Sequence, residues 1–306
     1  VLYNLLSLVK YRELKLKIKR FDDFIKNDIK LTQKEFKGEA GLEELNDKYD
    51  LFVCGSDQIW NPVCKDFSKA YLLDFVQDKS KCISYAASVG MTDIPEEFKG
   101  TFTDLLKGYK AVSVREGRAG EVLGEMLDRQ VEVMPDPVVL LNKEQWLQVA
   151  KAPKIKGKYI LCYYIGDVPG MRDFAKKMSK KSGLPIIVIN KNIRDMFYFN
   201  KKYYSAGPRE FVSLINNAEY ICTDSFHAVM FSLILHKNFW IFANQRNNNS
   251  STRIENILNI VGLKDRMLFG KTDGVEYDKK IDFSGIDDII GELRSKAENY
   301  LDTNTK

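Results

Sequence analysis

The chain has 306 residues, of which 44% are hydrophobic and 29% charged, a composition typical of a globular protein long enough for two domains. Its formal net charge is +5. This mild basic excess suits anionic small substrates or an anionic membrane surface. Without a recognisable nucleic-acid module it argues against a nucleic-acid partner, and the sequence has no apolar run long enough to cross a bilayer.

The five cysteines form neither a CxxC pair nor an even set, and four of them lie in apolar, strand-like runs. Their spacing fits neither a disulfide framework nor a zinc site. Since the chain has only two histidines, we expect no metal site, and we expect the cysteines to be buried free thiols of a protein in the reducing cytoplasm.

The N-terminal segment is charged and helical in pattern, with apolar residues among many lysines over residues 11–26. Such a helix can lie on a membrane surface. It can also pack one stripe on a core, and we favour this second interpretation because the apolar face is broken.

Strands and helices then alternate along the chain, which predicts βαβ units with parallel sheets. Residues 150–158 form a basic linker with one Pro and one Gly. We therefore expect an N-terminal domain over 1–149 and a C-terminal domain over 150–306, with the last helix packing back on the N-terminal domain. The strands are predicted at 49–54, 82–87, 111–114, 131–134, 159–165, 185–189, 218–223 and 239–243, and the helices at 95–108, 118–127, 171–181, 208–217, 253–260 and 286–300, with a further helix that has His227 in its first turn and His236 at its end.

The most informative segment follows the strand at 218–223, where Asp224 and Ser225 precede a helix that opens with His227. Open α/β sheets bind ligands at the carboxyl ends of their strands, and a helix start favours an anion. We expect His227 to carry a proton, although a lone histidine is more often structural. The other histidine, His236, ends the same helix, where an imidazole can cap carbonyl groups.

Three further turns carry candidate ligand-binding side chains. Arg115 follows a strand and can grip a carboxylate or phosphate, or form an internal ion pair. Arg246 lies in a polar loop and can reach an anion or remain solvated. In the turn at 55–62, polar side chains can bind sugar hydroxyls while a Trp stacks on the sugar, or the Trp can lie in the core; the residues are Ser56, Asp57, Gln58, Trp60 and Asn61.

Taken together, these turns resemble hallmark segments of the polysaccharide pyruvyl transferase family. The sequence has no GxGxxG, P-loop, HExxH or GxSxG motif to suggest another class. The resemblance covers roughly residues 49–262, and the segments that carry it are 49–62, 85–90, 114–116, 135–137 and 223–227.

The resemblance implies a fold like that of GT-B glycosyltransferases, with two Rossmann-like domains facing across a cleft. Family members open with a strand that this sequence lacks, so we expect the N-terminal sheet to be short of its first strand. The implied reaction moves a pyruvyl group from phosphoenolpyruvate to a sugar of a bacterial-type polysaccharide precursor as a ketal. It implies no metal or organic cofactor, and a cytoplasmic location that leaves open a lipid-linked acceptor and association with the inner face of the membrane.

By the same resemblance, each candidate residue has an expected role. His227 and Asp224 are expected to be catalytic, and Arg115, Ser225 and Arg246 to bind the donor. The 56–61 turn is expected to orient the acceptor. Two alternatives stay open: a GT-B glycosyltransferase that uses a nucleotide sugar, and a non-catalytic carbohydrate-binding relative.

Overall fold

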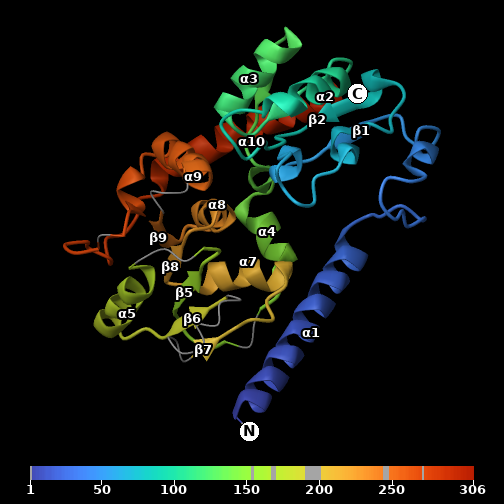
Figure 1. Ribbon diagram of the computed structural model, residues 1–306. Helices are drawn as coiled ribbons and strands as arrows, with labels where there is room; N and C mark the ends of the chain where they lie inside the picture. Colours follow the sequence, from blue (N-terminus) through green and yellow to red (C-terminus); the bar gives the residue numbers. More distant parts are fainter. Residues whose placement is uncertain (1, 153–154, 167–169, 190–200, 244–247, 271) are drawn as a thin grey trace. The chain divides into compact units, whose positions relative to one another are not determined.

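The computed structural model describes residues 2–152, 155–166, 170–189, 201–243, 248–270 and 272–306 (Figure 1). The chain divides into two compact units. The larger unit consists of residues 1–31 and 141–289, and the smaller unit of residues 32–140 and 290–306. The units therefore separate after Leu140 rather than at the expected boundary of 149/150, and the first 31 residues belong with the C-terminal half of the chain.

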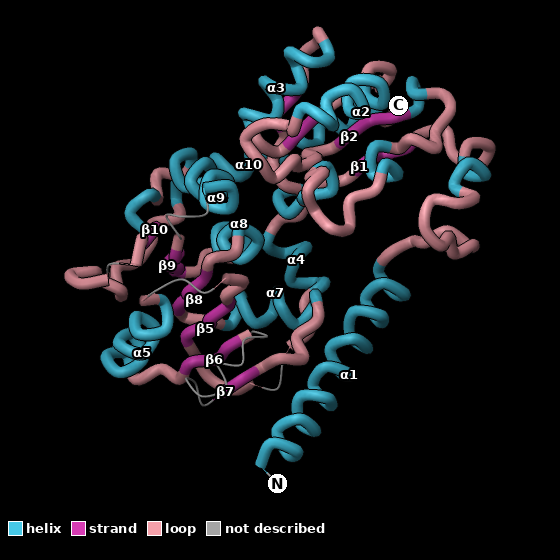
Figure 2. Tube along the Cα trace, viewed as in Figure 1, coloured by secondary structure: helices cyan, strands magenta, loops and turns pink. Residues whose placement is uncertain are grey.

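A six-stranded parallel sheet forms the centre of the larger unit (Figure 2), in the order β10-β9-β8-β5-β6-β7. The chain builds outward from β5 through β6 to β7, then returns to the other side of β5 to add β8, β9 and β10. The strand order thus reverses between β5 and β8, which makes this pair a topological switch point. The strands are β5 (Ile160–Tyr163), β6 (Ile186–Val188), β7 (Lys201–Lys202), β8 (Tyr220–Thr223), β9 (Asn238–Phe242) and β10 (Met267–Leu268).

Helices cover both faces of this sheet, as expected for parallel strands that read as continuous apolar runs. Phe174 and Met178 of α5 pack against Cys162 and Cys222 on one face. Figure 1 shows α7 on the other side of the strands, where the Tyr159 hydroxyl donates to the Leu214 carbonyl at 2.8 Å. The helices of this unit are α4 (Lys143–Val149), α5 (Met171–Ser182), α7 (Pro208–Asn217), α8 (Phe226–Ile234) and α9 (Asn248–Ile260).

The long helix α1 (Leu2–Asp28) lies beside α7. Arg20 Nη1 donates to the Ser205 carbonyl at 2.7 Å, and Arg209 pairs with Asp28 at 2.5 Å. The side chains that make these contacts are polar, whereas Ile18, Phe21 and other apolar residues of the helix are exposed. This corrects the expectation of an apolar stripe packed on a core, because charged groups attach the helix instead.

Four short parallel strands line up in the smaller unit in chain order, β1-β2-β3-β4. Ladders pair β1 with β2 and β3 with β4, and bridges from Ile83 to Ala111 and from Ala87 to Val114 join β2 to β3. Most of α10 (Ser284–Asn304) belongs to this unit, where the Tyr300 hydroxyl donates to the Ser84 carbonyl at 2.8 Å. Its other elements are β1 (Phe52–Cys54), β2 (Cys82–Ser84), β3 (Ser113–Val114), β4 (Glu132–Val133), α2 (Glu96–Leu106) and α3 (Gly117–Leu127).

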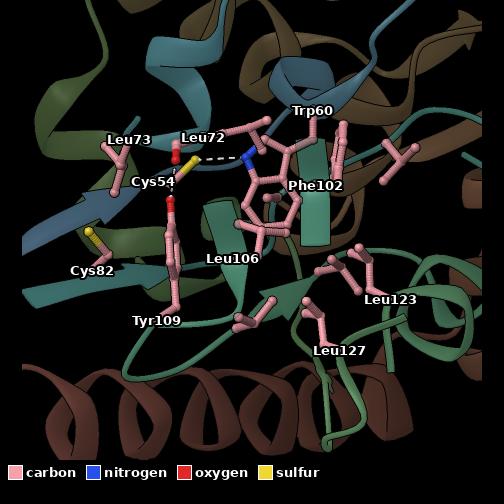
Figure 3. Close-up of a cluster of buried hydrophobic side chains, with 14 of the residues drawn as sticks. Cys54, Trp60, Leu72, Leu73, Cys82, Phe102, Leu106, Tyr109, Leu123 and Leu127 are labelled. Carbon is pink, nitrogen blue, oxygen red and sulfur yellow. Dashed lines mark hydrogen bonds between the residues drawn. The ribbon is translucent and has the colours of Figure 1, made fainter. Parts of the chain in front are cut away.

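Trp60 belongs to the buried core of the smaller unit, beside Phe102 (Figure 3). Its side chain is fully buried, with the ring edge-on to Phe102 at 6.2 Å. The indole N–H contacts Cys54 Sγ at 3.1 Å and donates to the Tyr71 carbonyl at 2.8 Å. Because a buried indole N–H needs an acceptor, these contacts fix Trp60 in the core.

The alternation of strands and helices expected from the sequence is confirmed, and the sheets are parallel. Cys54, Cys82, Cys162 and Cys222 are buried free thiols, and Cys64 is an exposed one. Helix α4 was not predicted, although Asn142 and Gln145 form a capping box at its start. Within the described residues, no helix has the length and apolar composition needed to span a membrane.

Candidate functional site

The turn between β8 and α8 lies at the switch point of the six-stranded sheet. Its own side chains fix its shape: Thr223 Oγ1 donates to the Tyr163 carbonyl at 2.6 Å and accepts from the Ser225 amide at 3.0 Å. Ser225 Oγ then accepts from the Ala228 amide at 3.4 Å as the N-cap of α8. A threonine that ends a strand and a serine that starts a helix therefore aim the first turn of α8 at the carboxyl edge of the sheet.

His227 is the second residue of α8 and is half-buried. Its ring lies 5.7 Å from the Phe226 ring at an interplanar angle of 75°. The imidazole thus stands at a helix N-terminus, where the partial positive charge of the unpaired N–H groups favours an anion.

Asp224 supports the neighbouring strand end. Its two carboxylate oxygens accept from the amides of Ile165 and Gly166, both at 2.7 Å. Burial raises the pKa of Asp224, and the two amide donors partly oppose that rise. A Cβ added at Gly166 would lie 3.1 Å from the carboxylate, so this approach suits a glycine. Asp224 thus joins the end of β8 to the backbone that follows β5, beside His227, and its catalytic role stays a prediction.

Arg115 forms the second cluster, at the carboxyl end of β3 in the smaller unit. Its side chain is 3% exposed, and Nη1 lies 2.5 Å from Asp136 Oδ2. Nη2 lies 3.5 Å from Asp57 Oδ1, and Nε lies 3.7 Å from Glu116 Oε1. Ser88 Oγ donates to Glu116. Among the described contacts, the cluster thus places one guanidinium beside three carboxylates.

Asp57 is the exposed member of this cluster, with 64% of its side chain accessible. Its backbone has φ 71° and ψ −176°, a region that glycine adopts and other residues rarely do. Its carbonyl accepts from the Ser88 amide at 2.9 Å, so the strand-end hydrogen bonds hold a strained residue beside Arg115.

Comparison with known proteins decides the family. The sequence profile of the polysaccharide pyruvyl transferases matches residues 3–246, well over half of the chain. The chain belongs to the polysaccharide pyruvyl transferase family. A search of curated proteins found no match.

Solved structures that align with the chain are distant. The wall teichoic acid polymerase TagF is 11% identical with a TM-score of 0.36, over 75% of this chain and 64% of that one. The glycosyltransferase SnogD from Streptomyces nogalater is 8% identical with a TM-score of 0.31, over 71% of this chain and 62% of that one. The chain spans less than two thirds of the length of either structure.

For this family member, the structure corrects the expectation of a tryptophan that stacks on a sugar and shows the surroundings of Arg115. Trp60 does not present its ring to a sugar, because it is buried and hydrogen-bonded in the core. Arg115 lies beside three carboxylates, the internal ion pairing that the sequence left open for it, and its role in donor binding stays a prediction.

The remaining predicted residues differ in exposure. Asn61 is buried, donates to Gln58 Oε1 at 3.2 Å and accepts from the Val63 amide, so it shapes its own turn. Ser56 and Gln58 are half-buried. Arg246 lies outside the described residues. The His236 ring pairs with a carboxylate, its Nε2 lying 2.7 Å from Asp287 Oδ1, and it stacks on the Phe283 ring at 5.0 Å.

Arg253 is a candidate that sequence reasoning missed. It projects from α9, and its guanidinium lies 5.7 Å from the centre of the Phe226 ring, beside the residue that precedes His227. The available signal was its place directly after the polar loop that contains Arg246. Among the described residues, no cluster of three or more His, Cys, Asp or Glu side chains is arranged to hold a metal.

Proposed function

We propose that this family member transfers a pyruvyl group from phosphoenolpyruvate to two hydroxyls of one sugar in a bacterial-type polysaccharide precursor, forming a ketal. The observation that carries the proposal is His227 in the first turn of α8, at the switch point of the six-stranded sheet. Phosphoenolpyruvate carries a carboxylate and a phosphate, and a helix N-terminus with an arginine nearby suits such an anion.

The residues fit the steps of this reaction. The methylene carbon of phosphoenolpyruvate takes a proton, and a sugar hydroxyl bonds to the neighbouring carbon with loss of its own proton. A second hydroxyl of the same sugar then displaces inorganic phosphate, loses its proton and closes the ring ketal. In this proposal His227 carries the proton, a contribution worth on the order of 10²–10⁴ in rate for a positioned acid or base.

Asp57 and its neighbour Ser56 bind the sugar acceptor in this proposal. The Asp57 carboxylate is exposed and can accept hydrogen bonds from sugar hydroxyls. The buried Arg115 holds this carboxylate in position, with Nη2 donating to Asp57 Oδ1 at 3.5 Å. Arg115 is thus a positioning residue in this proposal, and the strained backbone of Asp57 is consistent with a functional turn.

A thermal-shift screen tests the donor. We expect phosphoenolpyruvate to raise the melting temperature with a saturable concentration dependence. Stabilisation by nucleoside diphosphates or nucleotide sugars instead would replace the proposal with glycosyl transfer. Stabilisation by sugars alone would favour a binding module without catalysis.

Arg253→Gln sharpens the screen. We expect this variant to lose most of the stabilisation by phosphoenolpyruvate, because the donor's anionic groups lose a cation at the start of α8. Arg118→Gln is the matched control. Arg118 is an exposed residue of α3 that forms an ion pair with Glu121 on the same helix. An equal loss in both variants would rule out donor binding at α8.

A further inference from the structure

Helix α1 carries an exposed apolar stripe that the proposed chemistry does not use. Its members repeat at intervals of three and four residues, which places them on one face of a helix. Their side chains are 37–56% exposed. The stripe consists of Tyr11, Leu14, Ile18, Phe21 and Ile25.

A different face of α1 attaches the helix to the larger unit. Arg20 pairs with Glu210 at 3.2 Å, and its guanidinium lies 5.5 Å from the centre of the Tyr203 ring. Phe24 and Lys17, on the same side as Arg20, are half-buried. At 100° per residue, this attached face lies about 110° from the centre of the apolar stripe, so the stripe is left to solvent.

Basic side chains run along the free flank of the stripe. Arg12, Lys19 and Lys26 repeat every seven residues, and Lys15 lies between them and the stripe, with its ammonium 4.6 Å from the Tyr11 ring centre. All four are exposed. The face that α1 presents to solvent therefore joins an apolar stripe to a row of cations.

The acidic residues of the helix neutralise part of this charge and leave a cationic excess. Residues 11–31 contain seven Lys or Arg and four Asp or Glu, a net charge of +3. Asp28 is paired with Arg209 at 2.5 Å, away from the row. Asp23 pairs with Lys19 at 2.8 Å, and Asp22 is exposed.

We propose that α1 docks the protein on the surface of an anionic phospholipid bilayer. The apolar stripe would enter the boundary between headgroups and acyl chains, and the row of cations would contact anionic headgroups. This inference is independent of the donor and the reaction.

A second copy of the chain fits this surface less well. Helices that pair through such a stripe interdigitate side chains on both of its flanks, but one flank here contains Lys17 and Phe24, which are already half-buried. The other flank is cationic and would meet like charge in an antiparallel pair. A bilayer needs only the outward side of the helix.

Vesicle co-sedimentation of the full chain tests the proposal. We expect binding to vesicles that contain about one third phosphatidylglycerol, and at least tenfold weaker binding to pure phosphatidylcholine, because headgroup charge supplies much of the attraction. Raising the salt concentration should weaken the binding. Absence of binding to the anionic vesicles overturns the proposal.

Two sets of variants locate the contact. Ile18→Asp with Ile25→Asp should weaken binding more than about tenfold, since the stripe is no longer apolar. The control Ile260→Asp with Phe269→Asp makes the same change at exposed apolar residues elsewhere and should bind like the wild type. Far-UV circular dichroism and melting temperature check that each variant folds.

The cations are tested separately. Lys15→Gln, Lys19→Gln and Lys26→Gln should each weaken binding about fivefold, whereas the triple control at exposed Lys65, Lys107 and Lys180 should not. Retained binding in the Ile18 and Ile25 variant overturns the proposal. So does a dimer in sedimentation equilibrium that this variant dissociates, because the stripe then binds a second copy.

Discussion

The two units place polar clusters at the same topological position, the carboxyl ends of parallel strands, yet the clusters differ in charge and in strand order. At the start of α8, His227 and Arg253 lie beside a helix N-terminus, where the strand order reverses between β5 and β8. In the smaller unit the described strands follow in chain order without reversal, and Arg115 is balanced by three carboxylates. The comparison teaches that the same topological position can hold an arginine among carboxylates in one unit and a histidine at a helix N-terminus in the other.

The largest effect is expected on catalysis. His227→Asn should lower turnover on the order of 10²–10⁴-fold with little change in folding, because it removes the proton carrier. His236→Asn is the matched control: it changes the other histidine, which pairs with Asp287, and asparagine tolerates the backbone φ of 54° there. Phosphate release from phosphoenolpyruvate, with a panel of hexosides as acceptors, measures both. Equal activities in the two variants would contradict the role of His227.

The next effect is on the stability of the smaller unit. Asp136→Ala should lower the free energy of unfolding by about 3 kcal/mol, because Arg115 stays buried without its nearest carboxylate. Urea denaturation measures the loss. Glu121→Gln, which breaks the exposed pair with Arg118, should change stability by less than about 1 kcal/mol. If the two changes cost the same, the Arg115 cluster is not the buried ion pair described.

Asp57 offers a change of opposite sign. Asp57→Gly should raise the free energy of unfolding by about 1 kcal/mol relative to Asp57→Asn, because glycine adopts φ 71° and ψ −176° without strain. Both variants remove the carboxylate, so their difference isolates the backbone. Both should bind the sugar acceptor more weakly. A less stable glycine variant would show that Asp57 is unstrained.

The smallest effect is a pH dependence from the core thiols. Burial raises the pKa of Cys82 from 9.0 to about 11 and that of Cys54 from 9.0 to about 12. These thiols lose their protons at a lower pH in the unfolded chain than in the folded protein. Their contribution to the free energy of unfolding is therefore complete below pH 9 and is lost as the pH rises toward 11 and 12. Cys82→Ser should flatten this decline, whereas Cys64→Ser should not, because Cys64 is exposed. Urea denaturation midpoints at pH 8 and pH 10.5 measure this decline in stability for each variant.

Local patterns sufficed for most of the fold. Apolar runs that end in small polar residues predicted the strands, and Ser225 before an apolar helical run predicted the start of α8. The attachment of residues 1–31 to the larger unit could not be predicted in this way, because it depends on long-range pairs such as Arg20 with Glu210.

The candidate site was predictable only in part. The position of His227 followed from the strand-turn-helix pattern, but the partners of Arg115 come from three separate turns. From the sequence, Trp60 can either stack on a sugar or belong to the core. The hydrogen bond from its indole N–H to the Tyr71 carbonyl identifies it as a core residue. Arg253 reaches Phe226 from a different helix, a contact that no local pattern encodes.

The most direct measurement uses the fact that the chain has two histidines. In protein labelled with ¹³C and ¹⁵N at histidine, we predict that phosphoenolpyruvate shifts the imidazole signal that is missing from His227→Asn, saturably, and leaves the signal of His236 in place. If phosphoenolpyruvate leaves the His227 signal unmoved while a nucleotide sugar shifts it, the start of α8 is not the pyruvyl donor site.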